Sequence, residues 1–293
     1  MRTFVRVFGV FLLAVLGTAL VVGSGGGGGG DSADTREPLV TITGDNSVTI
    51  AGETWLAVGT GFEMNLPLLE ADPYSLTCDN APVGTVVVNP VNDTTASVVF
   101  NNCVLTVDTL SATVNGAMTF EAVAWSPDPF TDTVDAWSLT LRLTFDQLTV
   151  NDGTSTFTAD GTITARISTD DGGVTLTTRL TGSSLSWWED GSMTTVRDFT
   201  FVAVDHMDTS TYTYRVQGEI EGTAFGGRVV IATTTTFTGD TDGFPYAGSM
   251  TITGADNTSV TLTALDAVNI RLDVDDGSGV TTVDTTWAAL VGL

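Results

Sequence analysis

The chain of 293 residues contains no lysine, a single histidine and two cysteines, and these shortages exclude several kinds of protein. Thirty-five acidic residues stand against ten arginines, which gives a formal net charge of −25. Nucleic acids and anionic membrane surfaces require a basic footprint, so neither is expected as a partner. A charge of this sign favours a solvated acidic surface, the binding of divalent cations, or life in salty water.

The residues needed for common catalytic sites are also scarce. The only histidine, His206, could act as a general base only together with Asp205 or Asp208. A serine-based triad would need a positioned serine, and no Gly-x-Ser-x-Gly nucleophile elbow is present. The few glutamates are scattered, so no carboxylate pair for glycoside hydrolysis can be selected. We therefore expect no enzyme and no cofactor, and we interpret His206 as an exposed loop residue.

The N-terminus carries the pattern of an export signal. Arg2 and Arg6 precede an apolar run, Val7–Val22, that ends in small residues. A basic start, a short apolar segment and small residues are typical of a secretory signal peptide, which we expect over residues 1–23. The run is short for a membrane span, which needs roughly 20 apolar residues, and an uncleaved anchor is the alternative.

The end of this run approaches a lipoprotein processing site, where a cysteine should follow Gly23. The lipid-transfer reaction alkylates a cysteine thiol, and Ser24 occupies that position, so no acyl chain can attach there. The sequence does not decide whether Ser24 is natural or engineered. The glycine run at 25–30 is typical of a flexible leash, and we expect a tether over residues 24–38.

Cys78 and Cys103 are the only cysteines in the chain. An even number of cysteines in an exported protein predicts a disulfide. The bond would close a loop of about 25 residues and stabilise the fold by about 3.5 kcal/mol in a chain-entropy model. Zinc is not expected, because two cysteines and one histidine do not complete a tetrahedral site.

From Leu39 onward, apolar residues alternate with polar ones, many of which are threonine. Period-two segments such as Val48-Thr49-Ile50, 139–143 and 268–272 predict half-buried strands, and turn signals such as Asp276-Gly277 separate them. No convincing amphipathic helix is present. The best helical candidates are Phe62–Ala71, which Pro67 interrupts, and Trp287–Leu293, which could instead be an edge strand.

A short motif recurs along the strands. It begins at Phe100, Phe145 and Val196, which are 45 and 51 residues apart, and a glycine follows each start after 16, 16 and 22 residues. We interpret each unit as about three strands joined by short turns. The three units cover about 99–142, 143–194 and 195–237, and a C-terminal hairpin region follows them.

These patterns predict an all-β fold. The unit length is near that of a propeller blade, but the propeller signature residues are absent and three units are too few to close one. We predict a single domain over residues 39–293, built as an antiparallel meander of repeated three-strand units. The meander would be curled into a half-barrel or a two-layer sheet, with one face in water.

Several stretches resemble an uncharacterised family of glycine-run envelope lipoproteins from Gram-negative bacteria. The matching stretches are Phe100-Asn101-Asn102-Cys103, 143–148, Asp160-Gly161, 226–229, Phe237-Thr238-Gly239, 248–255 and Trp287. The resemblance implies a lipidated cysteine before the glycines, from which Ser24 departs, and Asp-rich turns near the C-terminus. It implies no activity, and it places the protein in the periplasm, at the outer-membrane surface or outside a Gram-negative cell.

The residues offer two candidate binding sites. Asp273, Asp275 and Asp276 form a weak calcium candidate, because the EF-hand pattern breaks at Gly277 and lacks its final glutamate. The tryptophans Trp125, Trp137, Trp187 and Trp188 could form a platform that stacks on sugars, although one tryptophan of an adjacent pair commonly packs in the core.

The sequence favours a non-catalytic exported protein of the cell envelope with a structural or surface-interaction role. The alternative is a periplasmic or surface binding module that holds a lipid or glycan in a concave sheet. Neither the envelope partner nor the oligomeric state can be read from the residues.

Overall fold

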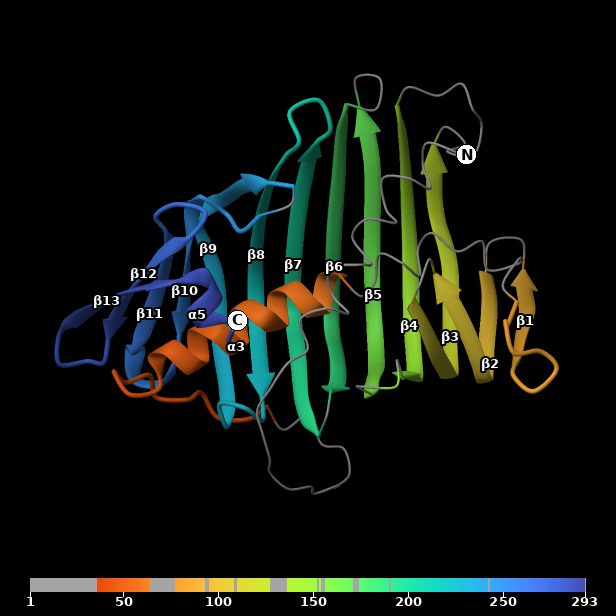
Figure 1. The fold of residues 1–293 in the computed structure, drawn as a ribbon, viewed down its shortest axis with the longest axis horizontal. Coiled ribbons are helices and arrows are strands. Elements are labelled where there is room, and N and C mark those ends of the chain that lie inside the picture. Colours follow the sequence, from red (N-terminus) through yellow and green to blue (C-terminus); the bar gives the residue numbers. More distant parts are fainter. Residues whose placement is uncertain are drawn as a thin grey trace.

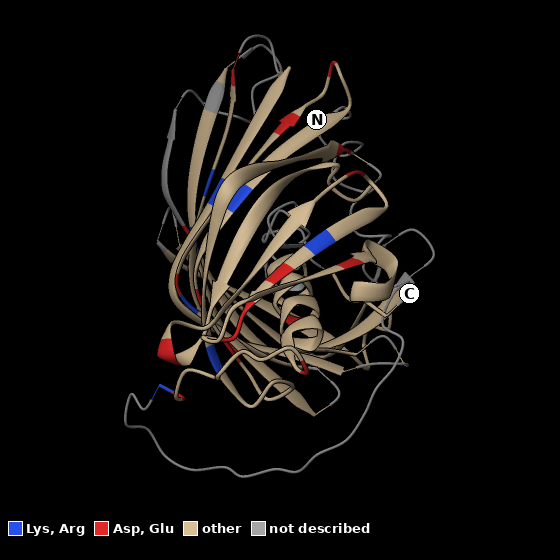
Figure 2. Cartoon of the chain, turned by 90° about the vertical axis from the view of Figure 1, so that its left-hand side faces the viewer, with Lys and Arg blue, Asp and Glu red and all other residues tan. Residues whose placement is uncertain are grey.

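A computed structural model shows one antiparallel sheet of thirteen strands, in which each strand pairs with its neighbours in sequence (Figure 1). The predicted all-β meander is confirmed. The sheet is a single curled layer, so the half-barrel arrangement is correct and the two-layer arrangement is wrong (Figure 2). The structure describes residues 36–63, 77–92, 95–107, 110–126, 136–151, 153, 156–170, 174–189, 191–241 and 243–292.

The strands are longest in the middle of the sheet and short at its C-terminal end. Their bounds are β1 Thr85–Asn92, β2 Thr95–Val107, β3 Leu110–Ser126, β4 Trp137–Asn151, β5 Thr156–Asp170, β6 Thr175–Glu189, β7 Ser192–His206, β8 Thr211–Gly222, β9 Gly227–Asp240, β10 Ala247–Thr253, β11 Ser259–Ala264, β12 Asn269–Asp275 and β13 Val280–Thr286. The short helix α5, Trp287–Leu290, follows β13, so the helical alternative for the C-terminus is correct.

Alternation along the strands gives the sheet one apolar and one polar face. In β11 the side chains of Val260, Leu262 and Ala264 are buried, while the threonines between them are half-buried on the other face. Polar-face threonines pair across strands, as in Thr144 with Thr162, whose hydroxyl oxygens are 3.1 Å apart. The apolar residues of all strands join one hydrophobic core on the concave face.

A helix of 17 residues, α3 at Ser47–Glu63, lies against this concave face (Figures 1 and 2). The prediction of a strand at Val48-Thr49-Ile50 is therefore wrong. Ile50, Ala51, Ala57 and Val58 are buried by the helix packing against the sheet. The segment is rich in β-branched residues and glycine, which are poor helix formers, so tertiary burial and not intrinsic propensity holds it in a helix.

The chain reaches the concave side by crossing the end of the sheet. Residues 38–40 run beside the start of β9: the amide of Arg228 donates to the Pro38 carbonyl, and the amide of Val40 donates to the Arg228 carbonyl, both at 3.0 Å. On the other side, the amide of Ala255 donates to the Val40 carbonyl at 2.8 Å. Ile42, two residues further on, is fully buried.

The recurring sequence motif corresponds to bulges that interrupt the strand register. Asn102, Gln147 and Asp198, the third residues of the three copies, adopt φ of 49°, 48° and 46°. The register shifts at each of them, in β2, β4 and β7 respectively. The facing glycines, Gly116, Gly161 and Gly218, also have positive φ. Such bulges bend and twist a sheet, so the motif marks curvature.

We interpreted each copy of the motif as the start of a three-strand unit. This interpretation is correct only for the distance between the second and the third copy. The bulged strands β4 and β7 are three strands apart, but β2 and β4 are two strands apart. The proposed boundary between residues 142 and 143 also falls in the middle of β4. The repeated element is therefore the bulge with its facing glycine.

The predicted disulfide between Cys78 and Cys103 is present, with Cα atoms 5.1 Å apart. It joins the segment before β1 to the middle of β2. Asn80 reinforces this connection, because its side chain donates to the Asn102 carbonyl at 2.9 Å and accepts from the Val104 amide at 3.0 Å.

Replacing Cys78 and Cys103 together by alanine should lower the free energy of unfolding by about 3 kcal/mol, because the unfolded chain loses the constraint of a closed loop. Urea unfolding of both proteins measures the difference. Alkylation of the unreduced protein should label no thiol, and two labelled cysteines would contradict the assignment.

Gly161→Ala should destabilise the protein more than Gly153→Ala does. Both glycines have positive φ, +129° and +91°, so both substitutions carry backbone strain of about 1–2 kcal/mol. A Cβ at Gly161 would also lie 2.9 Å from the Cα of Leu185 on the next strand, while nothing lies within 4 Å of one at Gly153. Overpacking should add about 1–3 kcal/mol in urea unfolding, and equal losses would contradict the close approach.

Candidate functional site

Four aromatic side chains gather on the concave face where α3 crosses the sheet. We call Trp55 of α3, Phe201 of β7, and Tyr212 and Tyr214 of β8 the concave aromatic set; all four are half-buried. The ring of Tyr214 lies 5.8 Å from Phe201, 6.0 Å from Tyr212 and 6.0 Å from Trp55 between centroids. The two tyrosine rings are inclined by only 22°, so they form a short stacked platform.

The strand period explains why these residues share one face. Tyr212 and Tyr214 are two residues apart on β8, and Val216, two residues further, is buried in the core. Tyr212 is also held at its edge, because its hydroxyl donates to the Gly243 carbonyl at 2.8 Å. A Cβ at Gly239 would lie 2.5 Å from the Tyr212 ring, so this ring lies directly over a glycine of β9.

The deeper side of the set is anchored in the core. Trp55 lies 4.3 Å from Trp287 and 5.3 Å from Phe237 between ring centroids. Trp287 and Phe237 are fully buried, and the Trp287 indole donates to the Pro245 carbonyl at 3.1 Å. The platform therefore has a rigid support, which is what a preorganised binding surface requires.

A carboxylate adjoins the platform. Asp205 of β7 faces Tyr212 on β8 and Leu176 on β6 in the strand register, on the concave face. Burial raises the pKa of the Asp205 carboxyl to about 6, and the charge of His206 acts in the opposite direction. A partly desolvated carboxylate accepts strong hydrogen bonds from hydroxyl and amide donors.

His206 does not form a catalytic arrangement with this carboxylate. Successive residues of a strand point to opposite faces, so His206 lies on the convex face, while Asp205 lies on the concave face. His206 is half-buried at the end of β7, opposite Thr175 and Thr211, and so the expectation of an exposed loop residue is wrong.

The tryptophan platform predicted from the sequence is not assembled by the adjacent pair. Trp187 is buried in the core with 3 % of its surface exposed, and Trp188 is 36 % exposed on the other face of β6. This is the packing alternative considered for such pairs. The side chains of Trp125 and Trp137 lie outside what the structure describes. The platform of Trp55, Tyr212 and Tyr214 was missed. The strand period alone could have placed Tyr212 and Tyr214 on one face, but the packing of α3 that brings Trp55 beside them could not be derived from the sequence.

The three calcium candidates do not converge on a common point. Asp273 accepts from the Thr282 hydroxyl, Asp275 from the Gly277 amide, and Asp276 from the amide and hydroxyl of Ser278. All three carboxylates therefore accept hydrogen bonds from residues of the single hairpin that β12 and β13 form. Within the described ranges, no three His, Cys, Asp or Glu side chains are grouped so that they could hold a metal ion.

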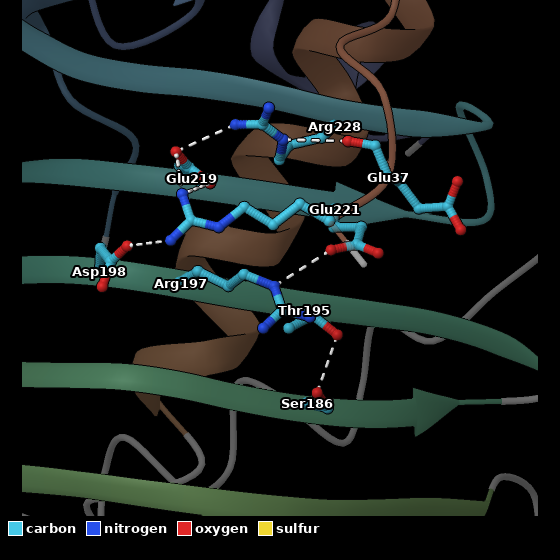
Figure 3. A network of polar contacts seen from close by, with 9 residues as sticks. Glu37, Ser186, Thr195, Arg197, Asp198, Glu219, Glu221 and Arg228 are labelled. Carbon is cyan, nitrogen blue, oxygen red and sulfur yellow. Dashed lines mark hydrogen bonds and ion pairs between the residues drawn. The ribbon is translucent and has the colours of Figure 1, made fainter. Parts of the chain in front are cut away.

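A network of ion pairs lies on the convex face, with α3 behind the sheet (Figure 3). Arg36 pairs with Asp198 at 2.9 Å and with Glu219 at 3.1 Å, and Glu219 also pairs with Arg228 at 3.0 Å. The Arg228 guanidinium donates to the Glu37 carbonyl at 3.1 Å. The network therefore fastens the N-terminal segment to β7, β8 and β9 before the chain crosses to the concave side.

The predicted processing site, Gly23 and Ser24, and the signal over 1–23 lie outside the described residues. In the part of the chain that the structure covers, no helix has both the length and the apolar character required to span a membrane.

Comparison with known proteins gives no relative. No protein-family model matches the chain, and neither a curated protein nor a solved structure matches it.

Asp205→Asn should stabilise the protein more at about pH 7.5 than at about pH 4. The folded state holds the Asp205 proton more tightly than the unfolded chain, whose aspartate pKa is near 4. Stability therefore falls as pH rises from about 4 through about 6, and the cost of the buried charge persists above that range. The variant carries no such charge and avoids this cost.

Urea unfolding of both proteins across this pH range measures the effect. Asp208→Asn, at an exposed turn position, is the matched control. A stability difference between Asp205→Asn and the unchanged protein that is the same at both ends of the range would contradict the buried carboxylate.

Proposed function

We propose that this protein is a non-catalytic, exported cell-envelope binding protein, and that the concave aromatic set together with Asp205 is its ligand-binding surface. The observation that carries the proposal is the stacked, half-buried pair Tyr212 and Tyr214, held over the concave face beside a carboxylate whose pKa is raised to about 6. The export signal predicted over residues 1–23 supports the location.

The chemistry of the surface favours a glycan over a lipid. Aromatic faces stack on the apolar faces of sugar rings, and a carboxylate accepts hydrogen bonds from sugar hydroxyls. An acyl chain would gain nothing from Asp205, whose charge becomes more costly when an apolar ligand covers it. A ligand with both ring faces and hydroxyl groups uses every group of the surface.

The position of the surface also supports binding. Asp205 and Tyr212 lie at the end of β7 and the start of β8, beyond the point where α3 crosses these strands (Figure 1). The helix itself contacts β7, β8 and β11, and contributes Trp55 to the platform.

Tyr212→Ala should weaken binding of a neutral oligosaccharide about two- to tenfold, since one stacking contact is worth about 0.5–1.5 kcal/mol. Calorimetric titration with cellohexaose, laminarihexaose, maltohexaose and chitohexaose identifies the sugar that binds. Tyr246→Ala, which removes an exposed tyrosine outside the set, is the matched control.

Binding that is lost equally in both tyrosine variants would contradict the assignment of the surface, as would failure of all four sugars to bind the unchanged protein. Thermal melts of each variant separate a lost contact from a lost fold. A fatty-acid probe, dansyl-undecanoate, is included in parallel, and saturable binding of this probe with no sugar binding would show that the glycan proposal is wrong.

A further inference from the structure

Three arginines form a row on the convex face of the sheet. In the strand register Arg166 of β5 is opposite Arg179 of β6, Arg179 is opposite Val202 of β7, and Val202 is opposite Arg215 of β8. We call Arg166, Arg179 and Arg215 the convex arginine row. Strands are about 4.8 Å apart, so the row extends over about 15 Å perpendicular to the strands.

Each member of the row points away from the core. Arg166 lies between Ala165 and Ile167, which are both buried, and Arg179 lies between Thr178 and Leu180, which are also buried. The three arginines themselves are exposed. The row is therefore on the face opposite α3 and the concave aromatic set.

The row differs from the other arginines of the described sheet. Arg36, Arg142, Arg197, Arg228 and Arg271 each form an ion pair with a carboxylate. Across the same described ranges, Arg166, Arg179 and Arg215 have no carboxylate within ion-pair distance. Like charges directly opposite each other on neighbouring strands are destabilising, and Arg166 and Arg179 are such a pair. In a chain of net charge −25, the arginines of the described residues that form no ion pair lie together on this face.

The surroundings of the row are rich in hydroxyl groups. The register places Thr164, Thr181 and Thr200 side by side along one flank, on β5, β6 and β7. Ser168 and Thr177 lie along the other flank. Guanidinium groups bind carboxylate or sulfate through two parallel hydrogen bonds, and the flanking hydroxyls can donate to and accept from sugar hydroxyls.

We propose that the convex arginine row binds an anionic glycan, a sugar chain that carries carboxylate or sulfate groups and lies across β5 to β8. This surface is separate from the concave aromatic set. Nucleic acid is disfavoured, because its recognition needs a broad basic footprint and, for single strands, aromatic side chains on which the bases stack, whereas the flanks of the row offer hydroxyl groups. A protein partner is disfavoured because the flanks offer hydroxyl groups in place of the apolar and aromatic anchors of an interface core.

The test compares two double variants with the same change in net charge. Arg166→Gln/Arg179→Gln removes two members of the row, and Arg36→Gln/Arg271→Gln removes two exposed, ion-paired arginines elsewhere. Polygalacturonate and dextran sulfate are the probes, neutral dextran is the uncharged control, and polyglutamate represents an acidic protein partner. Affinity is measured by calorimetry or layer interferometry at low and at high salt.

We expect an anionic glycan to bind the unchanged protein, more weakly at high salt, and neutral dextran not to bind. The row variant should bind roughly tenfold more weakly, a loss of about 1.4 kcal/mol, because two charge-assisted contacts are removed. The control variant should keep its affinity. Thermal melts verify that both variants fold.

Three results would overturn the proposal. The first is the absence of binding to both anionic polysaccharides at low salt. The second is an equal loss in the two double variants, which would reflect net charge alone. The third is binding of polyglutamate that equals or exceeds the binding of both polysaccharides, which would assign the row to an acidic protein. None of these results bears on the concave aromatic set, because the two double variants leave that set unchanged. In the same way, Tyr212→Ala leaves the row intact.

Discussion

The apolar face of a one-layer sheet must be removed from water, and the rest of this structure depends on how that is done. Among the described residues no second sheet covers the thirteen strands; the layer curls and α3 lies against its concave face (Figure 2). Ile50 of the helix, Phe237 of β9 and Trp287 of α5 are all fully buried as a result. Each such side chain contributes about 1.5–3 kcal/mol, so the helix and the curl stabilise each other.

The curl has a visible local cause and a consequence for the site. Bulges at Asn102, Gln147 and Asp198 bend the strands, each opposite a glycine or beside one on the next strand. Other glycines let aromatic rings lie flat against the sheet, as Tyr212 does over Gly239. The convex face, which needs no burial, carries hydroxyl groups, ion pairs and the convex arginine row.

Much of the sheet could be predicted from the sequence, since period-two alternation with threonine and valine gives strands directly, and two cysteines in a chain whose sequence predicts export indicate one disulfide. The helix could not, because residues 47–63 contain valine, threonine and glycine in an order that favours a strand until tertiary burial is counted. The bulges were visible in the sequence as a repeated motif, but the sequence did not show that each copy of the motif forms a bulge. The pairs Arg166 with Arg179 and Asp205 with Tyr212 depend on register, which shifts by a residue at each bulge and cannot be derived from local pattern. Tyr212 and Tyr214 lie two residues apart on one strand, so their shared face could be derived from the strand period.

The central claim is that the sheet curls around α3 and that this packing builds the concave surface. Nuclear Overhauser contacts between the Trp55 indole and the rings of Phe237 and Trp287 test it most directly in the isotope-labelled protein. The ring centroids are 5.3 Å and 4.3 Å apart, so strong cross-peaks to both rings are expected. Trp55 resonances with no contact to either ring, and with the shifts of a solvent-exposed indole, would contradict the account.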